Sequence, residues 1–596
     1  MAFSLDCKTQ KGISLSIILG LNVLHADSAA CLVVDGQLKS AIAEERLGAR
    51  EKHSPRFPAN AIRRVMQESG VRLKDITHVA IGKNPNANYG AKIGYVLGRP
   101  LKSAGAVAEH FRRKGNTSES LASLTEICGA DPTEARFEIV RVEHHLAHIA
   151  SSYFLSPFES TTAGFSYDCS GDFVSAMAAR CEGTHIKILD RVFLPHSLGS
   201  FYTALCQFIG FTQFGEEYKV MGLSAFGEDA YAGLMTELLS FDDSCWYALK
   251  KGYFGINEGV DGETHPVDES GKIRVGRIYT GMLFERLGAP RVNSDPISQR
   301  EKNIARSCQA RFEEAAMHCM KKLHALVPVS KLVLAGGCAL NGLTNARIQR
   351  DTLFKQSYIQ CAASDDGTCI GAAYYCYHEI LNQTKRFHMD HAFWGPEYPD
   401  YEIKKAVESS GYPLKHYEEI ELLRVVAKLI ADGKVVGWYQ GRSEWGPRAL
   451  GNRSILANPT IPSMKDTINS KIKRRESFRP FAPSVLREHV TTYFEEDLAS
   501  PFMMHVVKVK PEWRKRLPAV THIDGTARLQ TVERTQNRKY YDLIKAFYEL
   551  SGVAIVLNTS FNENEPIVDT PAQAVACFVR TNMDVLCLNN YLVVKE

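Results

Sequence analysis

The residue types most able to do chemistry in this 596-residue chain are arginines set among glycines and prolines. Residues 441–453 are GRSEWGPRALGNR, and residues 473–483 are KRRESFRPFAP. A guanidinium binds two oxygens of a phosphate or carboxylate at once, and Gly and Pro restrict the backbone that carries it. Trp445, Phe478 and Phe481 are interleaved with the charges and would anchor these segments. The pattern favours an anion site over a solvated basic loop, which is the usual explanation of a charge run.

Two histidines have the spacing of metal ligands. His144 and His148, in VEHHLAH, stand four residues apart and would share one face of a helix, where they can chelate one ion. A zincin protease needs Glu directly after the first His, and His145 occupies that position, so this class is disfavoured. For the pair alone, histidines of the surface or core remain the alternative.

Two acidic turns supply candidate oxygen ligands. Residues 166–172 (SYDCSGD) follow an expected strand, and residues 362–373 (AASDDGTCIGAA) lead into an expected helix of small residues. Carboxylates placed at strand ends gather at one edge of a sheet. Two His and two Asp suit Fe(II), Mn(II) or Zn(II) better than Ca(II). Whether Asp365 or Asp366 would bind the ion stays open.

Other segments offer phosphate contacts. In LAGGCALN (334–341) a strand runs into a Gly pair and then a helix, which exposes backbone amides at a helix N-terminus. Lys219, in FGEEYKVMG, offers a further contact, and HIDGTARLQ (522–530) and LNTSFN (557–562) add an arginine and a polar turn. Gly pairs are more often simple turns, and neither a Walker A motif nor GxGxxG occurs.

The bulk composition limits the classes of function. At 596 residues the chain predicts two to four structural units. A formal net charge of +4 is small for this length, so an extended nucleic-acid surface is not expected and small anions are the better partners. Fifteen scattered cysteines without a CxxC pair are typical of reduced thiols in a cytoplasmic protein. No apolar run reaches the length of a membrane span.

The order of apolar runs predicts an α/β protein in two parts. Residues 17–21 and 30–34 are expected strands on either side of a turn that carries His25. Residues 30–34 with Asp35-Gly36 and Gln37 predict strand, turn and strand, a β-hairpin that opens the domain, and further strands are expected at 79–81, 162–167 and 331–335. A cleaved leader beginning at Lys8 and Lys11 is the alternative for the first segment. We expect domains at 1–385 and 401–596, joined by a linker at 386–400.

Nine motifs together resemble one known family, the O-carbamoyltransferases of the nodulation-factor, cephem and aminoglycoside type. They occur in that family's order over nearly the whole chain: VEHHLAH, Asp-x-x-Gly-Asp, EYKVMGL, LAGGCALN, DDGT-x-x-GAA, GPRALGNRSIL, KRRE-x-FRPFAP, DGTAR-x-Q and LNTSFN. The resemblance implies an N-terminal actin-like ATPase domain, similar to the tRNA threonylcarbamoyl transferases. It also implies a C-terminal YrdC-like α/β domain.

The resemblance also implies a chemistry. The YrdC-like domain would form carbamoyl-adenylate from carbamoyl phosphate and ATP, with Mg²⁺ accompanying the nucleotide. The actin-like domain would then pass the carbamoyl group to a hydroxyl of a small-molecule natural product, with His25 as the base. Water exclusion around the adenylate predicts an internal path between the two domains.

Site residues carry over by position. The residues implied for carbamoyl phosphate are Arg448, Lys473, Arg479, Arg528, Asn558 and Ser560. Those implied for the nucleotide are Lys219, Gly336, Gly337 and Asn341. The metal ligands would be His144, His148, Asp168 and Asp365, and the resemblance favours Fe²⁺, with Mn²⁺ and Zn²⁺ as alternatives.

Two other functions compete with this one. A tRNA-modifying threonylcarbamoyl enzyme uses the same folds but needs a longer positive surface than one tight cluster provides. A non-catalytic actin-like nucleotide-binding protein is the second alternative. The sequence leaves the acceptor and the oligomeric state open, a homodimer included, and it places neither nucleic acid nor a membrane among the partners. Phe201, Tyr202, Tyr253 and Phe254 would line the acceptor site or belong to the core.

Overall fold

The computed structural model describes residues 15–23, 25–48, 50–97, 124–256, 273, 276–476, 478–479 and 481–595. Lys8 and Lys11, on which the leader alternative depends, lie outside these residues. Within them the protein is mixed α/β, so the predicted fold class is confirmed. Every helix in the described ranges is too short or too polar to cross a membrane. The cysteines of the same ranges are all free thiols.

The first five-stranded sheet of the described residues begins with the predicted hairpin. Its strands lie in the order β3 (Gln37–Ala43), β2 (Ala29–Val34), β1 (Ile17–Asn22), β4 (His78–Ile81), β5 (Glu138–Arg141). All of β1 is buried, as expected for a strand covered on both faces. Asp35 and Gly36 join β2 to β3 with φ values of 46° and 73°, which a two-residue hairpin turn requires.

A second five-stranded sheet repeats this topology. Its order is β12 (Gln356–Tyr358), β11 (Lys331–Ala335), β6 (Thr162–Gly171), β7 (Val174–Glu182), β8 (His185–Phe193). In both sheets three antiparallel strands stand on one side and two parallel strands on the other. Such a duplicated sheet is the arrangement expected of an actin-like ATPase domain, so that prediction is confirmed for the N-terminal part.

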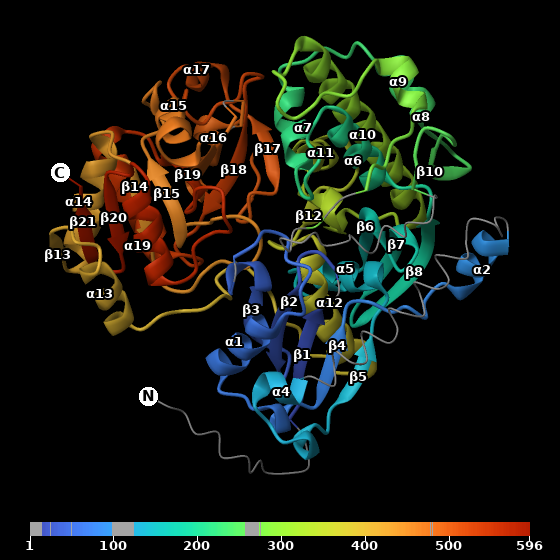
Figure 1. Cartoon of the computed structure of the whole chain (residues 1–596), viewed down its shortest axis with the longest axis horizontal. Coiled ribbons are helices and arrows are strands. Elements are labelled where there is room, and N and C mark those ends of the chain that lie inside the picture. The colour runs from blue at the N-terminus through green and yellow to red at the C-terminus, as the bar shows by residue number, and fades with distance from the viewer. Residues whose placement is uncertain are drawn as a thin grey trace.

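Helices fill the space between and beside these sheets. α5 (His144–Tyr153) packs on the second sheet, α12 (Thr368–Tyr375) packs on the first, and the two helices contact each other (Figure 1). A helical layer lies beside the second sheet: α6 (Leu198–Phe208), α7 (Glu217–Ser224), α8 (Ala232–Leu238), α9 (Met282–Leu287), α10 (Gln299–Leu326) and α11 (Gly342–Asp351). The hairpin of β9 (Leu239–Asp242) and β10 (Cys245–Leu249) belongs to the same layer. The helices beside the first sheet are α1 (Ala59–Ser69), α2 (Tyr89–Leu97) and α4 (Leu124–Cys128).

The C-terminal part is built on a mixed sheet of nine described strands. Their order is β13 (Leu414–His416), β21 (Tyr591–Val594), β20 (Val585–Leu588), β14 (Val436–Tyr439), β15 (Arg453–Ala457), β19 (Ile555–Ser560), β16 (Ala482–Leu486), β18 (Thr526–Val532), β17 (His505–Lys508). The helices are α13 (Asp400–Glu408), α14 (Glu419–Ala431), α15 (Met464–Ile468), α16 (Val490–Tyr493), α17 (Pro511–Arg514), α18 (Arg538–Ser551) and α19 (Pro571–Arg580). This sheet encloses its own hydrophobic core.

The two parts touch along several segments. β17 packs against α11, at the right edge of the C-terminal sheet in Figure 1. Arg442 donates to the carbonyls of Lys39, Trp394 and Gly395, which ties the arginine-rich loop to the first sheet and the predicted linker. Gly446, in the same loop, has φ 91°, and a Cβ there would lie 2.4 Å from the carbonyl oxygen of Cys361. The loop is therefore seated against the N-terminal part by backbone contact.

We expect Gly446→Ala to destabilise the protein by about 3 kcal/mol or more, because it adds a backbone clash to the cost of a left-handed alanine. Gly552→Ala is the matched control, since Gly552 has φ 70° but no atom within 4 Å of the added Cβ. It should cost about 1–2 kcal/mol. Urea unfolding of both variants measures the difference, and equal losses would show that the contact at Gly446 carries no strain.

Candidate active site: a histidine–aspartate cluster and a cationic pocket

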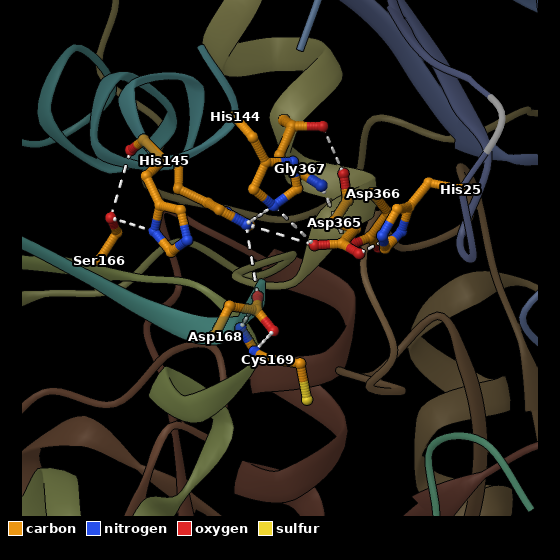
Figure 2. A network of polar contacts seen from close by, with 12 residues as sticks. His25, His144, His145, Ser166, Asp168, Cys169, Asp365, Asp366 and Gly367 are labelled. Atoms are coloured by element: carbon orange, nitrogen blue, oxygen red, sulfur yellow. Dashed lines mark hydrogen bonds and ion pairs between the residues drawn. The ribbon is translucent and has the colours of Figure 1, made fainter. Parts of the chain in front are cut away.

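Four side chains predicted as metal ligands converge on one point (Figure 2). The ligand atoms of His144, His148, Asp168 and Asp365 all lie within 4.8 Å of one another. The Nε2 atoms of His144 and His148 are 3.0 Å apart. Both histidines and Asp365 are buried, and Asp168 is half-buried. Buried charged groups are stable when they are paired or bind a metal, so this cluster is a candidate metal site.

Local structure aims each ligand. The backbone amide of His144 donates to Asp172 Oδ2 over 2.9 Å at the start of α5. β6 extends to Gly171, so the acidic stretch is not the turn after a strand that the sequence predicted. A register shift between Tyr167 and Gly171 instead marks a bulge at Asp168, and bulges re-aim side chains. Gly171 also makes room for His144, whose Cδ2 would lie 2.0 Å from an added Cβ.

The donor set fits a divalent cation. Asp365 Oδ1 lies 3.3 Å from both Nε2 atoms, so one carboxylate oxygen and two ring nitrogens converge on the same space. Burial would lower the pKa of His148, but hydrogen bonds and charge from Asp168 and Asp365 outweigh it and raise the pKa to about 9. An ion such as Fe²⁺, Mn²⁺ or Zn²⁺ can take the place of that proton.

The structure distinguishes Asp365 from its neighbour. Asp366 Oδ1 accepts from the amide of Gly367 over 3.0 Å and takes no part in the cluster. Burial, together with the charges of Asp27 and Glu45, holds the pKa of Asp366 well above its usual value. For Asp365, burial is outweighed by the charge of His25 and by the cluster histidines, which hold its pKa well below the usual range.

His25 lies beside the cluster at the turn between β1 and β2. Its Nδ1 is 2.5 Å from Asp365 Oδ2, and its ring centroid is 5.8 Å from that of His144. A carboxylate on Nδ1 holds the proton on that nitrogen and leaves Nε2 as the basic one. The arrangement is the one a general base needs next to a bound, activated group.

Of the residues predicted for the nucleotide, the Gly pair contacts the cluster. The amide of Gly337 donates to Asp168 Oδ2 over 2.6 Å, and Gly336 precedes it with φ 91°. Asn341 caps α11, and its amide exchanges hydrogen bonds with Gln309 at 2.9 and 3.1 Å. Asn341 therefore supports the helix N-terminus through contacts within the protein, whereas the Gly pair lies directly at the candidate metal site.

Lys219 joins the two parts of the chain. Its Nζ is 2.7 Å from Glu216 Oε1 and 2.8 Å from Glu476 Oε1, a residue of the C-terminal part. Burial would lower the pKa of Lys219, but these carboxylates outweigh it and raise the pKa. A second contact joins the same two parts of the chain: the Arg479 guanidinium lies 4.6 Å from the centre of the Tyr218 ring. α7 thus links the cluster-bearing part to the arginine-rich segments.

Those segments bring together arginines with few counter-charges, and we call the group of Arg448, Arg475, Arg479 and Arg528 the cationic pocket. Burial and neighbouring arginines lower the pKa of Arg475 to about 9, and they hold that of Arg528 well below its usual value. Burial lowers the pKa of Arg448 to about 10. Nε of Arg448 and of Arg528 and one terminal nitrogen of Arg475 are buried without a hydrogen-bond partner in the described residues. A multivalent anion would satisfy these groups and cancel their repulsion.

Three other predicted residues border this pocket with contacts of their own. Lys473 Nζ donates to both oxygens of Asn562, at 2.6 and 2.8 Å, and to Ser560. Ser560 Oγ donates to Asn562 Oδ1. Asn558 donates to Ala449 O and to Gln530, and its Oδ1 is buried without a partner. Lys473 therefore holds the loop, while Asn558 keeps an acceptor for a ligand.

Not every arginine of the segment 441–453 belongs to the pocket. Arg453 is fully buried, and its guanidinium donates to the carbonyls of Gln440, Gly441, Asn452 and Asp569. Arg442 is bound to carbonyls as described above. Of the three arginines in this motif, Arg448 is the one with an unsatisfied donor in the pocket. The aromatic residues Phe201, Tyr202, Tyr253 and Phe254 are buried in the hydrophobic core.

The sequence reasoning missed a second cluster, formed by Asp27, Glu45 and His53. Nδ1 of His53 is 2.7 Å from Asp27 Oδ1, and its backbone amide donates to Glu45 Oε2 over 2.9 Å. Asp27 and His53 both have positive φ, at 61° and 57°, which is uncommon for these residues. The signal that could have revealed it is the run of charged residues at 44–53, directly after a buried strand.

Removing one metal-binding side chain should weaken metal binding. We expect His148→Ala and Asp365→Asn to weaken the binding of Mn²⁺ by about 100-fold or more, because each deletes a donor atom. Asp366→Asn is the matched control, since it changes a neighbouring buried carboxyl outside the cluster, and it should bind within a few-fold of the unaltered protein. Calorimetric titration measures all three. Unchanged affinity in His148→Ala and Asp365→Asn would exclude the cluster as a metal site.

His53 should make stability pH-dependent. Burial is outweighed by Asp27, and the pKa of His53 is raised to about 9. Since the folded pKa exceeds the unfolded value of about 6.5, its contribution is complete below pH 6.5 and is lost as pH rises through 9. That contribution is at most about 3 kcal/mol, and solvent reduces it because the side chain is 30% exposed. Urea unfolding should show the gap between the protein and His53→Gln closing from pH 6 to 10, and a constant gap would contradict this.

Comparison with known proteins is consistent with both parts of the site. Residues 17–374 match the family model described as Carbamoyltransferase N-terminus, and residues 427–595 match Carbamoyltransferase C-terminus. Nodulation protein NolNO of Sinorhizobium fredii is 37% identical over 96% of this chain and 80% of its own length. An uncharacterized protein of Synechocystis sp. is 35% identical over 97% of this chain and 96% of its own length.

Among solved structures, full-length HypF in its phosphate- and nucleotide-bound form is similar over 62% of this chain and 47% of its own. The identity is 14% and the TM-score 0.31, which is too low to support any inference about function.

Proposed function

The chain belongs to the carbamoyltransferase family, and from this premise we propose that it is an ATP-dependent O-carbamoyltransferase. The C-terminal cationic pocket binds carbamoyl phosphate, and the N-terminal part delivers the activated carbamoyl group to a hydroxyl of a small-molecule natural product. The division at 1–385, 386–400 and 401–596, the YrdC-like character of the last domain and a cytoplasmic location belong to the same proposal.

One observation carries the proposal: buried guanidinium nitrogens without hydrogen-bond partners among the described residues occur in segments that contact α7, a helix of the part that holds the histidine–aspartate cluster. An unpaired buried cation is costly, and a substrate with several negative oxygens offsets that cost. Arg448, Arg479 and Arg528 would bind phosphate oxygens, and the free Asn558 Oδ1 would accept from a substrate donor. Lys473 and Ser560 would shape the loop around the ligand.

Atom balance defines the activation step. Water displaces phosphate from carbamoyl phosphate and leaves carbamate, and a carbamate oxygen attacks the α-phosphorus of ATP, which releases pyrophosphate and forms carbamoyl-adenylate. The pocket's cations stabilise the charge on the departing oxygens. Lys219, Gly336, Gly337 and Asn341 would hold the nucleotide, with Mg²⁺ as its companion ion.

The transfer step assigns the base. His25, oriented by Asp365, takes the proton of the acceptor hydroxyl, the oxygen attacks the carbamoyl carbon, and AMP leaves. A divalent ion held by His144, His148, Asp168 and Asp365 would neutralise charge on the leaving phosphate. Iron is the ion that we propose, with Mn²⁺ and Zn²⁺ as alternatives for the same donor set.

His25→Asn should separate the two steps. We expect pyrophosphate release in the presence of ATP and carbamoyl phosphate to persist, while carbamoyl transfer falls by about 10²- to 10⁴-fold, the usual contribution of a general base. The control is His416→Asn, which changes an exposed histidine on β13. Loss of both activities in His25→Asn would contradict separate roles for the two sites.

The acceptor is found by incubating the protein with ATP, carbamoyl phosphate and a panel of hydroxylated natural products, and measuring carbamate addition by mass.

Arg448→Gln should abolish pyrophosphate release in the same assay, because it removes a cation from the pocket. Consumption of threonine and bicarbonate in place of carbamoyl phosphate would overturn the proposal in favour of a threonylcarbamoyl enzyme.

A further inference from the structure

A buried arginine of the N-terminal part reaches the pocket-bearing loop of the C-terminal part. Arg46 ends the short helix of residues 44–46 that follows β3, and it is 3% exposed. Its Nη2 donates to the carbonyl oxygen of Gly446 over 2.5 Å. Gly446 is two residues before Arg448, so Arg46 lies beside the backbone that carries a pocket arginine.

The guanidinium of Arg46 is only partly used. Its Nη1 is buried and has no hydrogen-bond partner in the described residues. Among the ion pairs of the same residues, no carboxylate is paired with Arg46, although Arg453 shows how this chain satisfies a buried guanidinium with carbonyls. A buried charge with an unpaired donor is destabilising unless a ligand completes it. The hydrogen bond to Gly446 uses only Nη2 of the guanidinium, so Nη1 remains as a second donor.

We propose that Arg46 forms the N-terminal wall of the anion pocket and binds phosphate oxygens of its ligand. The ligand class is a pyrophosphate or phosphoryl anion, and its identity as part of a carbamoyl-transfer reaction rests on the proposed function. The pocket is then complete only where the two parts of the chain meet. Binding at this boundary between the two parts holds the activated carbamoyl group between the site of its formation and the histidine–aspartate cluster.

The test is calorimetric titration of the full chain with inorganic pyrophosphate at low and moderate salt. We expect Arg46→Gln to weaken binding by tenfold or more, as expected when a charge-assisted contact is lost. The variant should also show a smaller salt dependence of the affinity. Arg56→Gln is the matched control, because Arg56 belongs to the same segment but is exposed and paired with Glu51 at 3.1 Å. It should bind within twofold of the unaltered protein.

Folding is controlled separately. Thermal unfolding without ligand reports whether Arg46→Gln is folded, and Arg46→Lys keeps one donor for Gly446 while losing the fork. If Arg46→Gln unfolds, Arg46→Lys must still bind pyrophosphate several-fold more weakly. Suppose that Arg46→Lys unfolds at a lower temperature than the unaltered protein but is stabilised by pyrophosphate to the same extent. Arg46 would then only hold the loop, and the inference would be overturned.

Arg448→Gln separates this inference from the proposed function. If Arg448→Gln weakens binding while the Arg46 variants bind as the unaltered protein does, the N-terminal wall is refuted and the pocket stands. If Arg448→Gln also binds pyrophosphate normally, the pocket itself is refuted, and the proposed function falls with it. Weaker binding in Arg448→Gln and in the folded Arg46 variants, with Arg56→Gln unaffected, supports both.

Discussion

The carboxylate of Asp365 is the interaction on which the arrangement of the site depends. One oxygen lies 2.5 Å from His25 Nδ1, and the other lies 3.3 Å from the Nε2 atoms of both His144 and His148. A single buried group therefore fixes the orientation of His25, the proposed base, and faces the candidate metal ligands. Since both share one carboxylate, His25 cannot move without disturbing the cluster.

The duplicated sheet topology explains why these groups meet. β1 of the first sheet ends shortly before His25, and the irregular last part of β6 in the second sheet carries Asp168, while α5 and α12 pack between the sheets. Asp365 begins the short turn that leads into α12, and His144 begins α5. Strand ends and helix starts from both halves thus open on the same space, which is where α/β proteins usually place their ligands.

In the cationic pocket the charges all have the same sign, whereas opposite charges are paired in the histidine–aspartate cluster. The pocket's arginines are partly removed from water and repel one another: Arg448, Arg475 and Arg479 lower the pKa of Arg528, and Arg479 lowers those of Arg448 and Arg475. The fold tolerates this because Gly and Pro hold the loops and because other arginines, such as Arg453, bind carbonyls and stabilise the backbone. Such a pocket is preorganised for an anion, and the stabilisation is realised when the anion binds.

The sequence alone determined the residue types of the site, the opening hairpin and the α/β class, because helical spacing, strand alternation and turn residues are local properties. His144 and His148 needed only a helix to share one face. Tertiary structure decided what depends on contacts between distant segments: that Asp365 and not Asp366 joins the cluster, that Arg442 and Arg453 are bound to carbonyls, and that Arg46 and His53 lie near the site. Adjacent residues of equal chemistry differ only in the direction that the backbone gives them, and packing of remote segments sets that direction.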